Sequence, residues 1–279
     1  MADDALDAAV DDIRRRFFAN PAHVHPEADL SDLLDRAVIA RLDPLFGALT
    51  GCAVLAAGGY GRRTLHPFSD LDLLVLFSQE TDPGIVARVP GALGGVGFSL
   101  GHQVRRMSDF SRFDPDETDS CTAFFDARHL SGDRTLSAEL GESVLPRFIL
   151  ENRARLLAAL DQVRARRRSR YGQDREAREP DVKHGVGGLR DYHWIRWVSR
   201  VLGEECSEGA GSAAALLHRT RNFLHYLSGR DENVLSVGHQ SEIGRRLGYA
   251  GAAEFMEDYR ESTDTVVRCL EDLRKRIGS

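Results

Sequence analysis

A glycine turn, followed by a strand that opens with two acids, constrains the fold of this chain more than any other feature. Residues 58–63 read GGYGRR, and residues 69–77 read SDLDLLVLF. The run from Cys52 to Ala57 is apolar and ends at the glycines, as a buried strand ends in a turn. We therefore expect two neighbouring strands, at 52–57 and 69–77, joined through the glycine turn.

The two acids have a spacing that suits a metal ion. Side chains alternate across a strand, so Asp70 and Asp72 share a face, roughly 6.5–7 Å apart at Cα. Two such carboxylates can hold one or two Mg²⁺ ions. A solvated strand start is the plainer interpretation of an Asp-x-Asp. The glycines beside it favour the metal site.

The residues around the acids suit a phosphate ligand. Gly58 and Gly59 let backbone N–H groups approach phosphates closely. Arg62 is a candidate for neutralising phosphate charge, and Ser69 for capping or orienting Asp70. Together these residues predict chemistry at a nucleoside triphosphate.

The rest of the first half predicts an α+β domain. Apolar residues predict helices at 3–19 and 30–48, a third strand at 96–105 and a helix at 118–130. On the strand at 69–77, Leu71, Leu73, Val75 and Phe77 form one face, and the acids share the other with Leu74 and Leu76. We expect a small mixed sheet with helices on one side, in a domain spanning residues 1–135.

Strand patterns end near residue 136, and the second half predicts an all-α domain at 136–279. Helices are expected at 145–170, from 189, and at 212–228, 239–247 and 251–277. The last helix carries one long apolar stripe. The run of arginines at 164–170 is interpreted as a charged helix face.

Composition excludes several classes of protein. The net charge is −6, with 42% hydrophobic and 29% charged residues, as in soluble globular proteins. The acidic balance argues against nucleic acid as a partner. The chain has no apolar run of membrane-spanning length, no secretory signal pattern and no paired cysteine motif, so we expect a cytoplasmic protein with reduced thiols.

The turn and the acids together resemble the nucleotidyltransferase superfamily that includes DNA polymerase β. More narrowly, the chain resembles the PII-protein uridylyltransferases. That likeness rests on ordered segments: 58–63, 67–74, 101–105 (GHQVR), 126–133 (DARHLSGD), 179–183 (EPDVK), 187–191 (GGLRD), 229–230, 239–240 and 247–249.

The resemblance implies a polymerase-β-like domain followed by a helical domain. It implies Mg²⁺-dependent transfer of UMP from UTP to a tyrosine of the PII signalling protein in nitrogen regulation. It also places Lys183, Arg190 and Asp191 at or beside the nucleotide site. A pairing of Arg190 with Asp191 on the surface is the alternative.

Two departures from the family pattern affect the expected function. No His-Asp motif of the uridylyl-removing domain and no glutamine-sensing segment is found, so we expect either a fragment of the larger enzyme or a short natural relative that only adds nucleotide. Related transferases place a third carboxylate on the strand after the acids, but residues 96–106 contain none. The downstream acids that remain candidates are Asp109, Asp114, Asp116, Glu117, Asp119 and Asp126.

Three other functions stay open at this stage. One is AMP transfer from ATP to a protein, as in the glutamine-synthetase adenylyltransferases. Another is a nucleotide-binding regulatory module without catalysis. Nucleic-acid extension is the third, and the acidic net charge argues against it.

Overall fold

The computed structural model describes residues 2–78, 83–94, 97–172 and 174–278. Their contacts form two compact units, one of residues 1–17 and 25–152 and one of residues 18–24 and 153–279. The division falls inside a long helix, whereas the sequence predicts a domain boundary at 135/136, which stays a prediction. Each unit is described below by itself.

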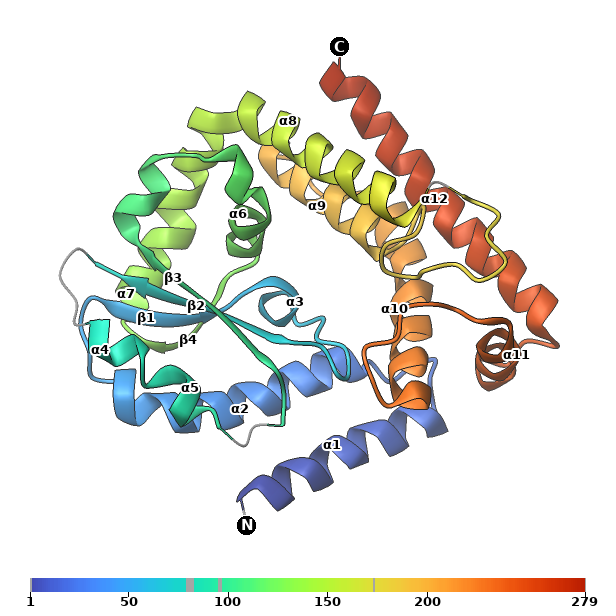
Figure 1. The fold of residues 1–279 in the computed structure, drawn as a ribbon, viewed down its shortest axis with the longest axis horizontal. Coiled ribbons are helices and arrows are strands. Elements are labelled where there is room, and N and C mark those ends of the chain that lie inside the picture. Colours follow the sequence, from blue (N-terminus) through green and yellow to red (C-terminus); the bar gives the residue numbers. More distant parts are fainter. Residues whose placement is uncertain (1, 79–82, 95–96, 173, 279) are drawn as a thin grey trace. The chain divides into compact units, whose positions relative to one another are not determined.

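The first unit combines a four-stranded sheet with helices (Figure 1). Its strands are β1 (Cys52–Ala56), β2 (Leu71–Phe77), β3 (Leu100–Arg106) and β4 (Arg128–Gly132). Its helices are α1 (Ala2–Ala19), α2 (Pro26–Phe46), α3 (Gly58–Gly61), α4 (Pro83–Val86), α5 (Val89–Ala92), α6 (Thr118–Phe125), α7 (Arg134–Glu139) and the start of α8 (Leu145–Tyr171). Short 3₁₀ turns at Met107–Ser111 and Pro115–Glu117 and a π-helical turn at Leu140–Val144 complete it.

The sheet is mixed, with strand order β3-β2-β1-β4. β1 pairs antiparallel with β2 and with β4, and β2 pairs parallel with β3. The α+β class and the mixed sheet predicted from the sequence are confirmed. The third strand begins at Leu100, and its predicted start at Val96 lies outside the described residues.

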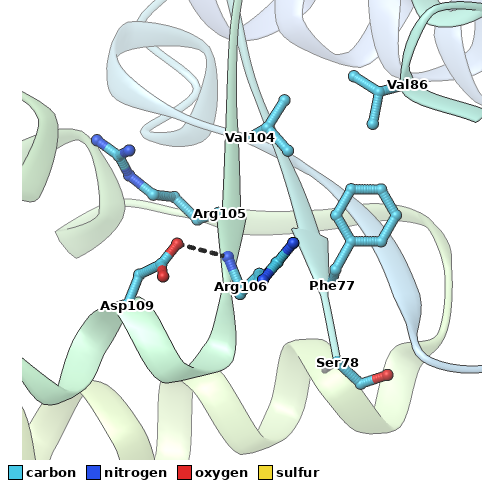
Figure 2. A pocket seen from close by; sticks show the side chains of 7 residues that line it. All are labelled: Phe77, Ser78, Val86, Val104, Arg105, Arg106 and Asp109. Atoms are coloured by element: carbon cyan, nitrogen blue, oxygen red, sulfur yellow. Dashed lines mark hydrogen bonds between the residues drawn. The ribbon is translucent and has the colours of Figure 1, made fainter. Parts of the chain in front are cut away.

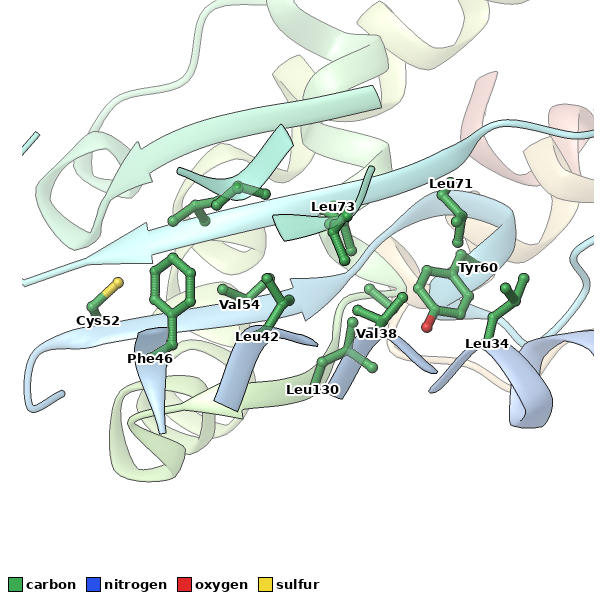
Figure 3. Packing of buried hydrophobic residues seen from close by; sticks show 14 of the residues in the cluster. Leu34, Val38, Leu42, Phe46, Cys52, Val54, Tyr60, Leu71, Leu73 and Leu130 are labelled. Carbon is green, nitrogen blue, oxygen red and sulfur yellow. The ribbon is translucent and has the colours of Figure 1, made fainter. Parts of the chain in front are cut away.

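The two faces of β2 separate as the alternation predicts. Leu71, Leu73, Val75 and Phe77 join a core with α2, to which Leu34, Val38, Leu42 and Phe46 contribute (Figure 3). Leu74 and Leu76 join a second core with Phe124 of α6 and Leu136 of α7. Helices therefore cover both faces of the sheet, and the expectation of helices on one side is wrong.

The predicted helix at 118–130 is also wrong in its second half. The helix α6 ends at Phe125, and residues 128–132 form β4 instead. Leu130 lies at a bulge of the β1–β4 ladder and packs in the α2 core. Because β1 is buried along its length, the peptide groups on its second edge need hydrogen-bond partners from another strand. This requirement comes from a distant part of the chain, so the local strand propensity of residues 128–132 does not predict it.

The second unit is helical, as predicted. It contains the rest of α8 with α9 (Leu189–Leu202), α10 (Glu208–Ser228), α11 (Val237–Arg246) and α12 (Ala252–Gly278). The stripe of α12 from Phe255 to Leu273 is buried, and Ile277 at its end is half-buried. Each of α9, α10 and α11 packs on α12.

Two further expectations from composition can be compared with the structure. All four cysteines are free thiols. No helix in the described part of the chain has the length and apolar character needed to cross a membrane.

Candidate active site

Asp70 and Asp72 lie at the start of β2, where the strand reaches the surface. Asp70 immediately precedes the strand, and Asp72 is its second residue. Both acids are exposed, whereas every other residue from Leu71 to Phe77 is buried. The folded chain thus leaves the two carboxylates accessible at the end of a strand that is otherwise held rigidly in two cores.

Two glycines make room for the Asp72 carboxylate. A β-carbon at position 58 would lie 2.8 Å from Asp72 Oδ2, and one at position 101 would lie 2.8 Å from Oδ1. Gly58 also has a φ of +54°, which favours glycine. The backbone N–H of Ala57 donates to the carbonyl oxygen of Asp72 over 2.8 Å, which ties the turn to the strand.

The glycine turn forms the single helical turn α3. The N–H of Gly61 donates to the carbonyl of Ala57 over 2.9 Å, and that of Arg62 donates to Gly58 over 3.1 Å. The first N–H groups of a helical turn have no acceptor within it, which here applies to Gly58 and Gly59. The backbone N–H groups of Gly58 and Gly59 are the groups that we predict from the sequence to bind a phosphate.

Arg62 lies in a buried ion pair. Its Nη1 is 2.9 Å from Asp126 Oδ2, and the two side chains are 7% and 9% exposed. Gly61 sits against the same segment, since a β-carbon there would lie 2.2 Å from the Asp126 carbonyl oxygen. Arg63 pairs with Asp32 on α2. Arg62 therefore fastens the glycine turn to the end of α6, and its predicted contact with phosphate stays a prediction.

Ser69 precedes the acids in a turn, where its N–H donates to the carbonyl of His66 over 3.1 Å. Its predicted role in orienting Asp70 stays a prediction.

No acid of β3 accompanies the pair on β2. Gly101 lies opposite Asp72, and Gln103 and Arg105 follow on the same face. Among the acids left open by the sequence, Asp126 is the one whose contacts reach the glycine turn, through Arg62 and Gly61. The Asp119 side chain lies outside the described residues.

In the second unit, Asp191 fastens the GGLRD turn. Its side chain is fully buried and pairs with both Arg167 and Arg168 of α8. Gly187 N–H also donates to its Oδ2 over 2.8 Å. The interpretation of the arginine run as only a charged helix face is therefore wrong for Arg167 and Arg168, because both pair with a buried carboxylate. The pattern within the helix could not reveal this partner, because Asp191 lies 23 or 24 residues away in sequence.

Lys183 and Arg190 lie near a second set of polar residues. Lys183 Nζ is 3.6 Å from Asp231 Oδ2, and Arg221 and His225 of α10 reach the same carboxylate. Sequence reasoning missed the two α10 residues. Their spacing of four on a helix, which places both on one face, is the signal that could have found them.

Asp70 and Asp72 fit a magnesium ion that a nucleotide helps to hold. No group of three or more His, Cys, Asp or Glu side chains suited to a metal occurs within the described ranges. Mg²⁺ is commonly held by one or two carboxylates together with substrate phosphates and waters, so two acids suffice. The absence of β-carbons at Gly58 and Gly101 gives the Asp72 carboxylate itself the room it occupies.

A hollow of about 170 Å³ lies elsewhere in the first unit. Figure 2 shows its lining at the far ends of β2 and β3, with Phe77, Val104 and Arg106 among the residues drawn. Arg106 N–H donates there to Asp109 over 2.8 Å. Asp70 and Asp72 are at the opposite end of β2, so this hollow is separate from the candidate site.

Comparison with known proteins identifies relatives of this chain. A family model described as GlnD PII-uridylyltransferase matches residues 155–215 and 200–273. Proteins named bifunctional uridylyltransferase/uridylyl-removing enzyme match more of the chain. The one from Caulobacter vibrioides (strain NA1000 / CB15N) is 34% identical over 214 residues, covering 70% of this chain and 23% of the relative.

Two further relatives extend the match. The Cereibacter sphaeroides protein is 32% identical, covering 85% of this chain and 29% of its own length. The Rhodospirillum rubrum protein is 30% identical, covering 95% and 33% respectively. The chain therefore spans a quarter to a third of the length of the curated relatives it matches.

A mixed sheet with a glycine turn, followed by a helical region, is the architecture that the resemblance to nucleotidyltransferases implies. The comparisons confirm the narrower resemblance that the sequence indicates. This chain is a homologue of the PII-uridylyltransferase family.

Proposed function

We propose that this chain is a Mg²⁺-dependent nucleotidyltransferase that moves UMP from UTP to a tyrosine hydroxyl of a PII signalling protein in the cytoplasm. The observation that carries the proposal is the exposed Asp72 carboxylate held between the backbones of Gly58 and Gly101. Family membership supports the donor and the acceptor, since the relatives are named uridylyltransferases.

In this proposal Asp70 and Asp72 hold the metal, and the N–H groups of Gly58 and Gly59 bind the triphosphate. When bound, Mg²⁺ neutralises charge on the triphosphate and on the leaving pyrophosphate. Ser69 orients Asp70. Positioning and electrostatics account for most of the rate in reactions of this class.

We assign two buried charged groups, one in each unit, to positioning. Arg62, held by Asp126, fixes the angle of the glycine turn, and Asp191 fixes the turn that precedes α9. Lys183 and Arg190 are assigned to the phosphates of the nucleotide. A buried ion pair holds a single geometry when both partners are present, and loss of one partner leaves an uncompensated charge.

The acceptor needs help to lose its proton. A tyrosine hydroxyl has a pKa near ~10 and is mostly protonated at neutral pH. Asp70 and Asp72 are the exposed carboxylates at the site, so they are the groups that can accept the proton or lower the pKa through a bound cation.

Mass spectrometry of a PII protein incubated with this chain, Mg²⁺ and each of the four triphosphates tests the proposal. The expected result is the mass of one UMP on a tyrosine peptide, with UTP only. Addition of AMP would replace uridylyl transfer with adenylyl transfer. Nucleotide binding without any added mass, under conditions in which a known uridylyltransferase modifies the same PII, would favour a regulatory binding module.

A further inference from the structure

Three nitrogen-bearing side chains in the second unit, those of Lys183, Arg221 and His225, converge on the carboxylate of Asp231. Arg221 Nη2 lies 3.0 Å from Asp231 Oδ1, His225 Nε2 lies 2.9 Å from the same oxygen, and Lys183 Nζ lies 3.6 Å from Oδ2. The three come from two separate segments, α10 and the loop before α9. Bonds from Val182 N–H to the Asn233 carbonyl and from Leu235 N–H to the Pro180 carbonyl hold the loops together.

These side chains are more buried than the carboxylate that they contact. The side chains of Arg221 and His225 are 8% and 0% exposed, whereas that of Asp231 is 42% exposed. The cluster therefore opens to solvent on the side of the carboxylate. An anion from solution would approach from that side.

Arg190 adds a further positive charge beside this group, since its backbone N–H donates to the carbonyl oxygen of Lys183 over 2.9 Å. Burial is the main cause that lowers the pKa of Lys183 and of Arg221, and the charge of Arg190 also lowers both. Asp231 thus pairs with Lys183, Arg221 and His225, and the more buried carboxylate of Asp181 also acts on Lys183 and Arg221, with Arg190 close by.

We propose that Lys183, Arg190 and Arg221 form a binding site for a phosphate group, in which Asp231 is a built-in counterion that an incoming phosphate displaces. Arginine offers paired donors to phosphate oxygens, and lysine supplies a compact charge. The Arg221 Nε is already held by Asn233 Oδ1 over 2.8 Å, which orients the guanidinium before a ligand arrives. The identification of this phosphate as part of a nucleoside triphosphate rests on the proposed function.

The chain offers a direct probe of this site. Lys183 is one of only two lysines, and Lys275 is the other. Burial and the neighbouring cations lower the pKa of Lys183, which increases its reactive neutral amine. Lys275, whose side chain is 77% exposed, serves as an internal control in the same molecule.

The experiment is acetylation of the intact chain, with each lysine peptide quantified by mass spectrometry, in the absence of Mg²⁺. Arms with pyrophosphate, UTP and uridine separate a phosphate ligand from a base ligand. We expect pyrophosphate and UTP to slow acetylation of Lys183 and to leave Lys275 unchanged, with no effect of uridine. Unchanged labelling of Lys183 at millimolar pyrophosphate, or equal protection by uridine, would overturn the site.

Two variants test the charges. Arg190→Gln should weaken the protection by pyrophosphate, whereas Arg245→Gln, an exposed arginine on α11, should not. Asp231→Asn should tighten pyrophosphate binding about fivefold, the effect of removing one nearby like charge at a partly exposed site. Weaker protection in a folded Asp231→Asn protein would show that Asp231 is purely structural and would overturn the displacement.

The result is independent of transferase activity. Asp72→Asn should abolish transfer and keep the protection of Lys183 by pyrophosphate. Protection without transfer in the unmodified chain would leave the anion site standing and contradict the proposed function. Nucleotidyl transfer without protection of Lys183 would support the proposed function and overturn the anion site.

Discussion

Asp72 on β2 lies directly opposite Gly101 on β3, and a β-carbon at position 101 would stand 2.8 Å from its Oδ1. The parallel ladder fixes this register from Leu71 to Phe77, so the carboxylate and the glycine cannot move apart independently. The orientation of Asp72, a candidate metal ligand, therefore depends on the absence of a side chain at Gly101.

Gly101→Ala should lower transfer roughly 10²-fold, because small displacements of a reacting group have effects of this size. Its stability should change little, since the clashing atom is the mobile end of a side chain. Activity and urea unfolding of the same preparation measure the two effects. Gly141→Ala is the matched control, because nothing lies within 4 Å of a β-carbon there. Full activity in Gly101→Ala would show that the space beside Asp72 is not needed.

Asp70→Asn and Asp72→Asn should each lower transfer by at least about 10²-fold, as removal of a key electrostatic group does. Both side chains are exposed, so the folded state should persist, with unchanged circular dichroism and thermal midpoint. Asp272→Asn, an exposed acid on α12, is the control. A double Asn variant that retains full activity would refute the assignment of these residues to the metal.

Asp126→Asn should lower the free energy of unfolding by about 3 kcal/mol, because it removes the carboxylate charge that pairs with the buried Arg62 guanidinium. The exposed pair of Lys275 with Asp272 provides the comparison, since loss of such a pair costs about 0–1 kcal/mol. Denaturant titrations of Asp126→Asn and Asp272→Asn measure the difference. Equal values for the two would show that Arg62 does not depend on Asp126.

His184 should make the second unit sensitive to acid. Its ring stacks on Tyr171 with centroids 4.1 Å apart. Burial, followed by the charges of Lys183 and three arginines, lowers the His184 pKa from 6.5 to about 4. Between these values the unfolded chain binds a proton that the folded chain does not, so this stability is full above pH 6.5 and is lost as the pH falls towards 4.

Urea unfolding at pH 7, 5 and 4 measures the effect. The unmodified chain should lose more stability on acidification than His184→Gln. His25→Gln, which removes a histidine whose side chain is 60% exposed, should follow the unmodified chain. Identical pH dependence in His184→Gln and the unmodified chain would contradict the assignment.

Local patterns in the sequence predicted the elements that do not depend on distant partners. The helices α8 and α12 follow from apolar residues at helical spacing. The two faces of β2 follow from strict alternation, and the glycines before it predict the turn at α3. β4 was missed because its strand conformation is imposed by the open edge of β1, which lies more than 70 residues earlier in the chain.

The sequence alone predicts that two acids open a strand after a glycine turn, because that spacing is local. It does not predict which charged side chains pair with one another. Only the tertiary structure paired Arg62 with Asp126, buried Asp191 against Arg167 and Arg168, and gathered Lys183, Arg221 and His225 around Asp231. An ion pair depends on which segments the packed cores bring together, and no periodicity within one segment contains that information.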